Sequence, residues 1–217
     1  MTDDPTSAVA RPPTIGTEDG ERLEVAWSGP ADPDLVVVLT HPHPQYGGDM
    51  HNLVPATLAR VLPEQGHATV RVNFRGTGSS TGTHGGGEAE ISDVRAAVDA
   101  AAETHPTATV AAVGYSFGAD VLLAVDDPRL AAVVAVAPPL AVLDIARLRN
   151  PRGACPTLVL AAEHDQFRPF ADARTAVAEW PATDVEPIDG TDHFLAGASN
   201  RVADAVVTFL ADINPRR

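Results

Sequence analysis

The sequence predicts one α/β domain built on a mainly parallel sheet, and three observations lead to this prediction. Short, continuous apolar runs such as 35–40 and 131–137 recur along the chain, as expected of parallel strands buried on both faces. Stretches with helical apolar periodicity lie between these runs. The links between them are short. This alternation favours right-handed βαβ units in one sheet with helices on both faces.

About eight strands and six helices are expected. The strands, of which the first two form an edge hairpin across a turn, are predicted at 14–17, 22–28, 35–40, 68–73, 110–113, 131–137, 156–161 and 184–188. The helices are predicted after residue 52 and at 88–104, 119–124, 141–148, 170–180 and 200–213. Residues 1–13 are polar and rich in proline, so we expect a flexible N-terminal tail. Residues 14–217 contain no repeat or linker that would divide a single domain.

Composition excludes several classes of function. The net charge of −14 disfavours binding to nucleic acids and to anionic membranes, because both are negatively charged. The chain contains no lysine, so lysine-based catalysis is excluded. No apolar run is long enough for a membrane span, and the first residues lack the features of a secretory signal. One cysteine, Cys155, excludes an internal disulfide, and we expect a cytoplasmic protein.

The sequence Gly114-Tyr-Ser116-Phe-Gly118 fits the G-x-S-x-G nucleophile elbow between a predicted strand and a predicted helix. A serine at such a turn has a strained backbone, and the flanking glycines let strand and helix approach each other. Its Oγ then points outward at the carboxyl end of the sheet. The N–H of Phe117 begins the helix, where the helix dipole favours an oxyanion. The alternative interpretation is a Gly/Ser turn without chemistry.

The order of the elements and the elbow together resemble the α/β-hydrolase fold, over nearly the whole chain from residue 14. Three stretches narrow the resemblance: His-Pro-His-Pro with Gly-Gly and Met-His-Asn at 41–52, Asn-Phe-Arg-Gly-x-Gly-x-Ser at 73–80, and the elbow at 114–118. They resemble a group of small bacterial α/β-hydrolases related to dienelactone hydrolases. Dienelactone hydrolases carry cysteine where this chain has Ser116, so the resemblance implies the fold and a serine triad and leaves the substrate open.

The resemblance implies an acid and a histidine after the elbow, because α/β-hydrolases carry their triad in the order Ser, Asp or Glu, His. The segment after the strand at 156–161 looks like the acid loop of the family, with Asp165 as the acid and Glu163 as the alternative. The segment at 189–194 looks like the histidine loop. Only His164 and His193 follow the elbow, and His164 adjoins the acid. We therefore expect His193 to be the base.

A second oxyanion donor is expected from the loop after the strand at 35–40. Pro42 and Pro44 have no N–H, so the N–H of His43 is the first candidate and that of Gln45 the second. The N–H of Phe117 completes the predicted oxyanion hole.

Two other interpretations of these loops are less favoured. His41, His43, His51 and Asp49 could suggest a metal site, but no third and fourth ligands have recognisable spacing. The glycine-rich run at 76–82 fails the dinucleotide-binding template, because its third glycine position holds Thr81. We therefore expect no metal and no cofactor. Arg75 is expected to tie loop carbonyls together through its planar guanidinium group, with substrate binding as the alternative.

We therefore predict a serine hydrolase that cleaves small carboxylic esters or thioesters through an acyl-enzyme, with the catalytic residues Ser116, His193 and Asp165. No sizeable lid domain is expected between 137 and 156, so the cleft is open to a small-molecule acyl substrate. Its predicted apolar walls are Tyr46, Phe117, Pro138 and Phe167. The alternatives are a serine peptidase or amidase, a cofactor-free lyase or haloperoxidase, and a non-catalytic binding module on the same scaffold.

Overall fold

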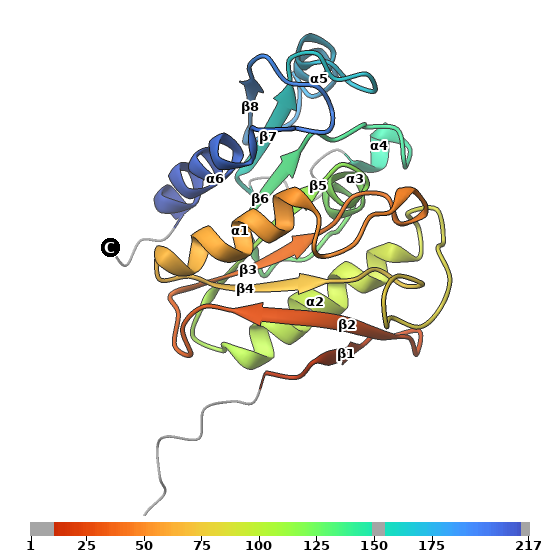
Figure 1. Ribbon diagram of the computed structural model, residues 1–217, viewed down its shortest axis with the longest axis vertical. Helices are drawn as coiled ribbons and strands as arrows, with labels where there is room; N and C mark the ends of the chain where they lie inside the picture. Colours follow the sequence, from red (N-terminus) through yellow and green to blue (C-terminus); the bar gives the residue numbers. More distant parts are fainter. Residues whose placement is uncertain (1–10, 149–154, 214–217) are drawn as a thin grey trace, which may run out of the picture.

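The computed structural model describes residues 11–148 and 155–213 of the chain (Figure 1). Within these ranges eight strands form one sheet with the order β1-β2-β4-β3-β5-β6-β7-β8. The strands are β1 (Thr14–Gly16), β2 (Arg22–Ser28), β3 (Leu35–Thr40), β4 (Ala68–Val72), β5 (Thr109–Tyr115), β6 (Leu130–Val136), β7 (Thr157–Ala162) and β8 (Thr183–Ile188). β1 and β2 pair antiparallel, as do β2 and β4, and all other pairs are parallel. The predicted α/β architecture is confirmed.

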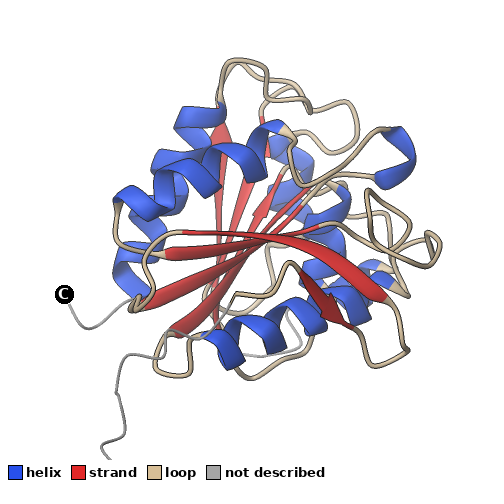
Figure 2. Cartoon of the chain, turned by 60° about the horizontal axis from the view of Figure 1, so that its bottom comes forward, coloured by secondary structure: helices blue, strands red, loops and turns tan. Residues whose placement is uncertain are grey.

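Helices cover both faces of the twisted sheet (Figure 2). They are α1 (Leu53–Glu64), α2 (Glu90–Thr104), α3 (Phe117–Leu123), α4 (Ile145–Leu148), α5 (Phe170–Ala176) and α6 (Ser199–Ile213). Side chains of α1 and α6 form one apolar core with one face of the sheet, and side chains of α2 and α3 form the other. Alternate residues of β3 enter opposite cores: Val36 and Val38 face α2 and α3, and Val37 faces α1 and α6. This two-sided burial explains why the strands are continuous apolar runs in the sequence.

The order in which successive strands join the sheet changes direction between β3 and β5. β3 is followed in the chain by β4 on one side, whereas β5 is followed by β6 on the other. Thr40 at the end of β3 pairs with Gly114 near the end of β5. In open α/β sheets such a reversal leaves a crevice beyond the carboxyl ends of the strands, where ligands bind.

Two helices are four residues shorter than predicted. α4 begins at Ile145 instead of residue 141, because the N–H groups of Ala141 and Val142 donate to the Asp120 carboxylate at 2.8 and 3.0 Å. These two residues therefore form a loop. α5 ends at Ala176 instead of residue 180 and is followed by a turn, in which the N–H of Trp180 donates to Val177.

The predicted tail, residues 1–13, lies mostly outside the described residues, and its last three residues contact the sheet edge. The N–H of Val25 donates to the Pro13 carbonyl at 3.0 Å, and Trp27 Nε1 donates to the Pro12 carbonyl at 2.9 Å. Arg11 donates to the Gly29 carbonyl. Residues 11–13 are therefore fixed to β2 and the turn after it.

The β1–β2 hairpin holds the glycine-rich loop that follows β4. Arg75 at the start of this loop donates to Asp19 of the hairpin turn at 2.8 Å and to Asp93 of α2 at 2.7 Å. Glu24 of β2 accepts from Asn73 Nδ2 at 2.8 Å and from the Ser79 N–H at 2.9 Å. Arg75 is thus structural, but the expectation of carbonyl partners is wrong, because its partners are carboxylates.

The described helices give no candidate for a membrane span: none in residues 11–148 and 155–213 is both long enough and apolar enough.

Candidate active site

Ser116 lies at the sharp turn between β5 and α3. Its φ of 53° and ψ of −117° are a strained backbone conformation for a residue with a side chain. The Ser116 N–H donates to the Val136 carbonyl at 2.9 Å, which ties the turn to the neighbouring strand β6. The turn therefore has the geometry expected of a nucleophile elbow.

The two glycines of the elbow lie in contacts that leave no room for a side chain. A Cβ on Gly114 would lie 2.5 Å from the Gly118 carbonyl oxygen. A Cβ on Gly118 would lie 2.5 Å from the His41 carbonyl oxygen and 2.6 Å from Thr40 Oγ1. Thr40 Oγ1 also donates to the Gly118 carbonyl at 3.1 Å. The spacing of the motif thus brings α3 directly against the end of β3.

Ser116, His193 and Asp165 form a continuous chain of hydrogen bonds. Ser116 Oγ lies 2.8 Å from His193 Nε2, and His193 Nδ1 lies 2.7 Å from Asp165 Oδ2. All three residues are buried. A carboxylate can only accept, so Nδ1 carries the proton and Nε2 presents its lone pair to the serine hydroxyl. In this arrangement an imidazole can take a hydroxyl proton while the carboxylate stabilises its charged form.

Backbone donors fix the orientation of the Asp165 carboxylate. Its Oδ1 accepts the N–H groups of Phe167 at 2.8 Å and Arg168 at 3.1 Å, which leaves Oδ2 for the histidine. The loop of His193 is held by the Tyr115 hydroxyl, which donates to the His193 carbonyl at 2.9 Å. Burial, and secondarily the charge of Asp165, raises the pKa of Tyr115 to about 12, so this hydroxyl keeps its proton.

The alternative acid and the other histidine lie elsewhere. Glu163 Oε2 accepts the Gly190 N–H at 2.8 Å and lies 3.7 Å from Nε2 of the exposed His164. Asp192 Oδ1 accepts the Phe194 N–H at 3.0 Å, a local loop contact. Of the two carboxylates considered for the acid, Asp165 is therefore the one that contacts His193.

The side chains of the two residues expected to supply the oxyanion donors pack against each other. The rings of His43 and Phe117 are 4.9 Å apart between centroids. In residues 11–148 and 155–213, neither backbone N–H has a hydrogen-bond partner. The Gln45 N–H instead donates to His43 Nδ1 at 3.2 Å, so the second candidate donor is engaged. His43 is the better candidate by this geometry.

His41 joins the loop after β3 to the loop after β4. Its Nε2 accepts the Phe74 N–H at 3.0 Å, and its Nδ1 donates to the Pro42 carbonyl at 2.6 Å. Burial lowers the pKa of His41 to about 4, which keeps the ring neutral. Both ring nitrogens are thus engaged by backbone groups.

Apolar side chains are exposed at the surface, and two of them lie beside His193. Among the described residues, the exposed large apolar side chains all follow the carboxyl ends of strands: Tyr46, Leu53, Ile145, Phe167 and Phe194. The rings of Phe167 and Phe194 lie edge-on to the His193 ring at 4.6 and 5.8 Å. Pro138, also expected in the pocket wall, is buried directly after β6. An exposed apolar surface of this kind is typical of a ligand-binding site.

Three residues near this site were not predicted from the sequence. Phe194 directly follows His193 and is 64% exposed. An aromatic residue in an otherwise polar loop is the feature of the sequence that could have indicated its place at the site. Asp120 is buried in α3 and accepts the N–H groups of 140–142. His84 lies 5.2 Å from the Phe117 ring. A single sequence gives no signal for the last two, because their partners are distant in the chain.

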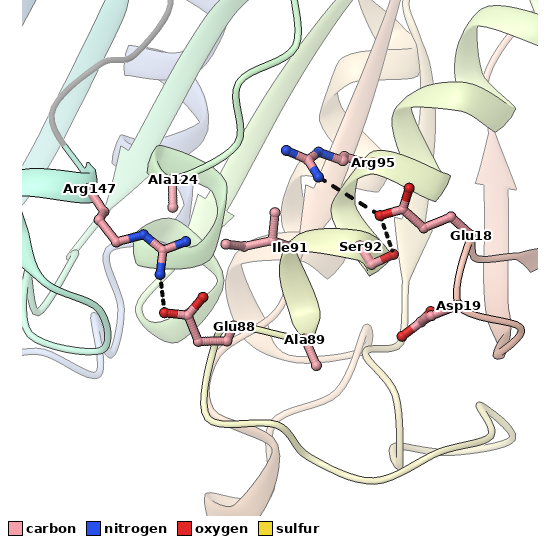
Figure 3. Close-up of a pocket in the computed structure, with 9 residues that line it drawn as sticks. All are labelled: Glu18, Asp19, Glu88, Ala89, Ile91, Ser92, Arg95, Ala124 and Arg147. Carbon is pink, nitrogen blue, oxygen red and sulfur yellow. Dashed lines mark hydrogen bonds and ion pairs between the residues drawn. The ribbon is translucent and has the colours of Figure 1, made fainter.

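A cavity of about 280 Å³ lies away from this site, at the amino-terminal end of α2 (Figure 3). Its lining is polar, and its two arginines are already paired: Arg95 with Glu18 and Arg147 with Glu88. None of the residues grouped around Ser116 lines it.

Comparison with known proteins supports the architecture. An uncharacterized protein of Rickettsia prowazekii is 28% identical, over 88% of this chain and 85% of that protein. An α/β serine hydrolase homologue from Coxiella burnetii has a similar structure, with a TM-score of 0.79, 28% identity and coverage of 91% of this chain and 95% of that one. The α/β serine hydrolase without a lid from Xanthomonas campestris has a TM-score of 0.82, 27% identity and 94% coverage of both chains.

A family profile matches most of the chain. The family described as X-Pro dipeptidyl-peptidase (S15 family) matches residues 19–183, which include the elbow and the candidate acid. The expected membership of the α/β-hydrolase superfamily is confirmed by these comparisons. The chain is a serine hydrolase of the α/β-hydrolase superfamily and belongs to its X-Pro dipeptidyl-peptidase (S15) family.

Proposed function

We propose that this protein hydrolyses small carboxylic esters or thioesters through an acyl-enzyme formed on Ser116. The observation that carries the proposal is the hydrogen-bonded chain from Ser116 Oγ to His193 at 2.8 Å and from His193 to Asp165 at 2.7 Å. A serine hydroxyl is a poor nucleophile until a base takes its proton, and this chain supplies such a base.

In the first half-reaction, Ser116 Oγ attacks the carbonyl carbon while its proton passes to His193 Nε2. The negative charge collects on the former carbonyl oxygen, which the N–H groups of Phe117 and His43 stabilise. Asp165 stabilises the imidazolium. The bond to the alkoxide or thiolate then breaks, and His193 gives its proton to the leaving group. In the second half-reaction water attacks the acyl-enzyme in the same way and releases the acid.

The surroundings of the site favour a small or slender apolar acyl group. Tyr46 and Phe167 are 86% and 62% exposed, and they lie beside the oxyanion loop and the histidine respectively. Pro138 and the Phe117 ring extend this apolar wall inward. The described part of the segment between β6 and β7 contains only the short helix α4.

A peptidase activity is the second candidate, because the matching family is described as X-Pro dipeptidyl-peptidase. An enzyme that removes dipeptides must bind the free ammonium group of its substrate, which calls for an available carboxylate. Three buried carboxylates lie near the site, and each already accepts at least two hydrogen bonds from protein groups: Glu90, Asp120 and Asp165. Because each of these buried carboxylates is already used by protein groups, they support the ester over the peptide as the substrate.

Labelling with a fluorophosphonate, followed by mapping of the adduct, tests the nucleophile. We expect one adduct on Ser116 and none in Ser116→Ala. A protein that folds normally but takes up no label is a binding module, and a lyase or haloperoxidase would turn over without an acyl intermediate.

Two substrate series then separate the hydrolytic activities. We expect kcat/KM for p-nitrophenyl acetate, butyrate and octanoate, or for the matching acyl thioesters, to exceed that for glycyl-prolyl-p-nitroanilide. A preference for the anilide would reverse the assignment in favour of the peptidase.

A further inference from the structure

A buried carboxylate in α2 organises the end of the glycine-rich loop. Glu90 is fully buried, and it accepts the N–H groups of Gly85 at 2.7 Å and Gly87 at 2.8 Å. His84 Nδ1 lies 2.9 Å from Glu90 Oε1. Gly87 has a φ of 102°, and a Cβ there would lie 2.8 Å from Val142, so the loop can fold over the carboxylate only with glycine at this position. Through these backbone hydrogen bonds Glu90 fixes the segment that directly follows His84, and its carboxylate also lies against the His84 ring.

The His84 ring contacts both residues whose N–H groups are the proposed oxyanion donors. Its centroid lies 4.8 Å from that of His43 and 5.2 Å from that of Phe117. The His43 and Phe117 rings are themselves 4.9 Å apart, so the three rings form one mutually packed cluster. This cluster joins the loop before α2, the loop after β3 and the start of α3.

His84 is the inner support of His43. Two other rings contact His43, and that of Tyr46 is 86% exposed, so it can hold His43 only from the solvent side. Phe117 is almost fully buried and lies at the fixed start of α3. Burial lowers the pKa of His43, and a charge on His84 acts in the same direction. His43 is therefore a neutral ring packed between a rigid phenylalanine and an anchored histidine.

We propose that His84, held by Glu90, is a positioning residue that sets the distance between the N–H groups of His43 and Phe117. This inference rests on the proposed function. An oxyanion hole is effective only when its donors are already in place before charge develops on the substrate. In this proposal His84 acts through His43 and Phe117 and is not itself a contact of the substrate.

The proposal predicts an effect on the transition state with little effect on substrate binding. His84→Ala should lower kcat roughly 10-fold to 100-fold, while KM changes less than about threefold. This loss of kcat is smaller than, or close to, the loss caused by removing one oxyanion-hole donor completely. The affinity for an alkyl boronic acid, which forms a tetrahedral anion on the serine, should fall by the same factor as kcat. Both are measured with p-nitrophenyl butyrate as the reporter substrate.

His84→Asn separates positioning from folding. Its side-chain amide leaves a polar group beside Glu90, and the Gly85 and Gly87 N–H groups still donate to that carboxylate, but the outer part of the ring is removed. We expect a Tm close to that of the wild type together with the same loss of kcat as in His84→Ala. The matched control is His164→Ala, which removes an exposed imidazole beside a carboxylate and should leave kcat unchanged.

Wild-type kcat in His84→Asn would overturn the proposal, because the ring would then play no part. A rise in KM that accounts for the whole loss, with unchanged boronate affinity, would overturn it too and make His84 a substrate contact. Ser116→Ala distinguishes a failure of the proposed function from a failure of the proposed role of His84. If it retains full esterase activity the proposed function fails, whereas an inactive Ser116→Ala with a fully active His84→Ala removes only the role of His84.

Discussion

The carboxylate of Asp120 accepts the backbone N–H of Leu140 at 2.9 Å, which joins the helix after the elbow to the loop after β6. The same carboxylate accepts the N–H groups of Ala141 and Val142. Leu140 has a φ of 51°, so the loop is held in a conformation that a residue with a side chain adopts only with support. Burial raises the pKa of Asp120, although the three N–H donors favour its charged form. This one side chain thus holds the loop that follows Pro138.

Asp120→Asn is expected to lower the free energy of unfolding by about 2 kcal/mol, because the amide replaces an acceptor with a donor that faces backbone N–H groups. Urea unfolding at pH 7 measures the change. Asp126→Asn, at an exposed position three residues after α3 ends, is the control and should stay within about 0.5 kcal/mol of the wild type. Equal stability of the two variants would show that the carboxylate does not hold the loop.

Asp165→Asn should lower kcat for ester hydrolysis roughly 10⁴-fold, because an amide no longer stabilises the imidazolium and favours the wrong tautomer of His193. Glu163→Gln should be nearly silent, since its amide oxygen can still accept the Gly190 N–H. Steady-state kinetics of both variants with one p-nitrophenyl ester decide between the two acids. The reverse order of effects would assign the acid to Glu163.

Gly118→Ala is expected to lower both stability and activity, because its Cβ would lie 2.5 Å from the His41 carbonyl oxygen. Moving α3 away from β3 relieves the clash but also separates the His43 and Phe117 N–H groups. We expect a loss of about 1–3 kcal/mol in the free energy of unfolding and at least a 10-fold loss in kcat. Gly16→Ala, where nothing lies within 4 Å of the new Cβ, should change neither quantity appreciably. Unchanged kcat in Gly118→Ala would argue against close packing of the two donor loops.

The buried His41 predicts a loss of stability in mild acid. Its pKa is about 4 in the folded protein and 6.5 in the unfolded chain, so between these values the unfolded chain binds the extra proton. The free energy of unfolding should therefore fall as pH decreases from 6.5 to 4, by up to about 3 kcal/mol from this residue. His41→Gln keeps an acceptor for the Phe74 N–H but does not titrate. Urea unfolding between pH 4 and 7.5 should show a smaller slope in this variant, and identical slopes would contradict the prediction.

The features that the sequence predicts best depend on local or strictly periodic patterns. The strands are recognisable because a parallel sheet covered on both faces needs apolar side chains at every position, as in Leu35–Thr40. The elbow is recognisable because the clashes at Gly114 and Gly118 allow no other residue. Asp165 and His193 follow from their places after the last two strands.

The features that the sequence does not reveal depend on contacts between distant segments. Asp120 looks like an ordinary helical carboxylate until residues 140–142 fold onto it, and this contact also removes the first turn expected for α4. Arg75 was expected to bind carbonyls, but Asp19 and Asp93 lie within its reach only in the folded chain. His84 similarly gains its partners from three different elements.

The proposed role of His84 links the antiparallel hairpin at the margin of the sheet to the chemistry at its centre. Through Asp19 and Glu24 it holds the segment that leads from Arg75 to His84. A shortened chain starting at residue 30 would keep Ser116, His193 and Asp165. In that chain, however, Arg75 would pair with Asp93 alone, and the Ser79 N–H would lose the Glu24 carboxylate as its acceptor. We therefore expect the smallest active fragment to include β1 and β2, and we expect substitutions that disrupt this hairpin to lower kcat.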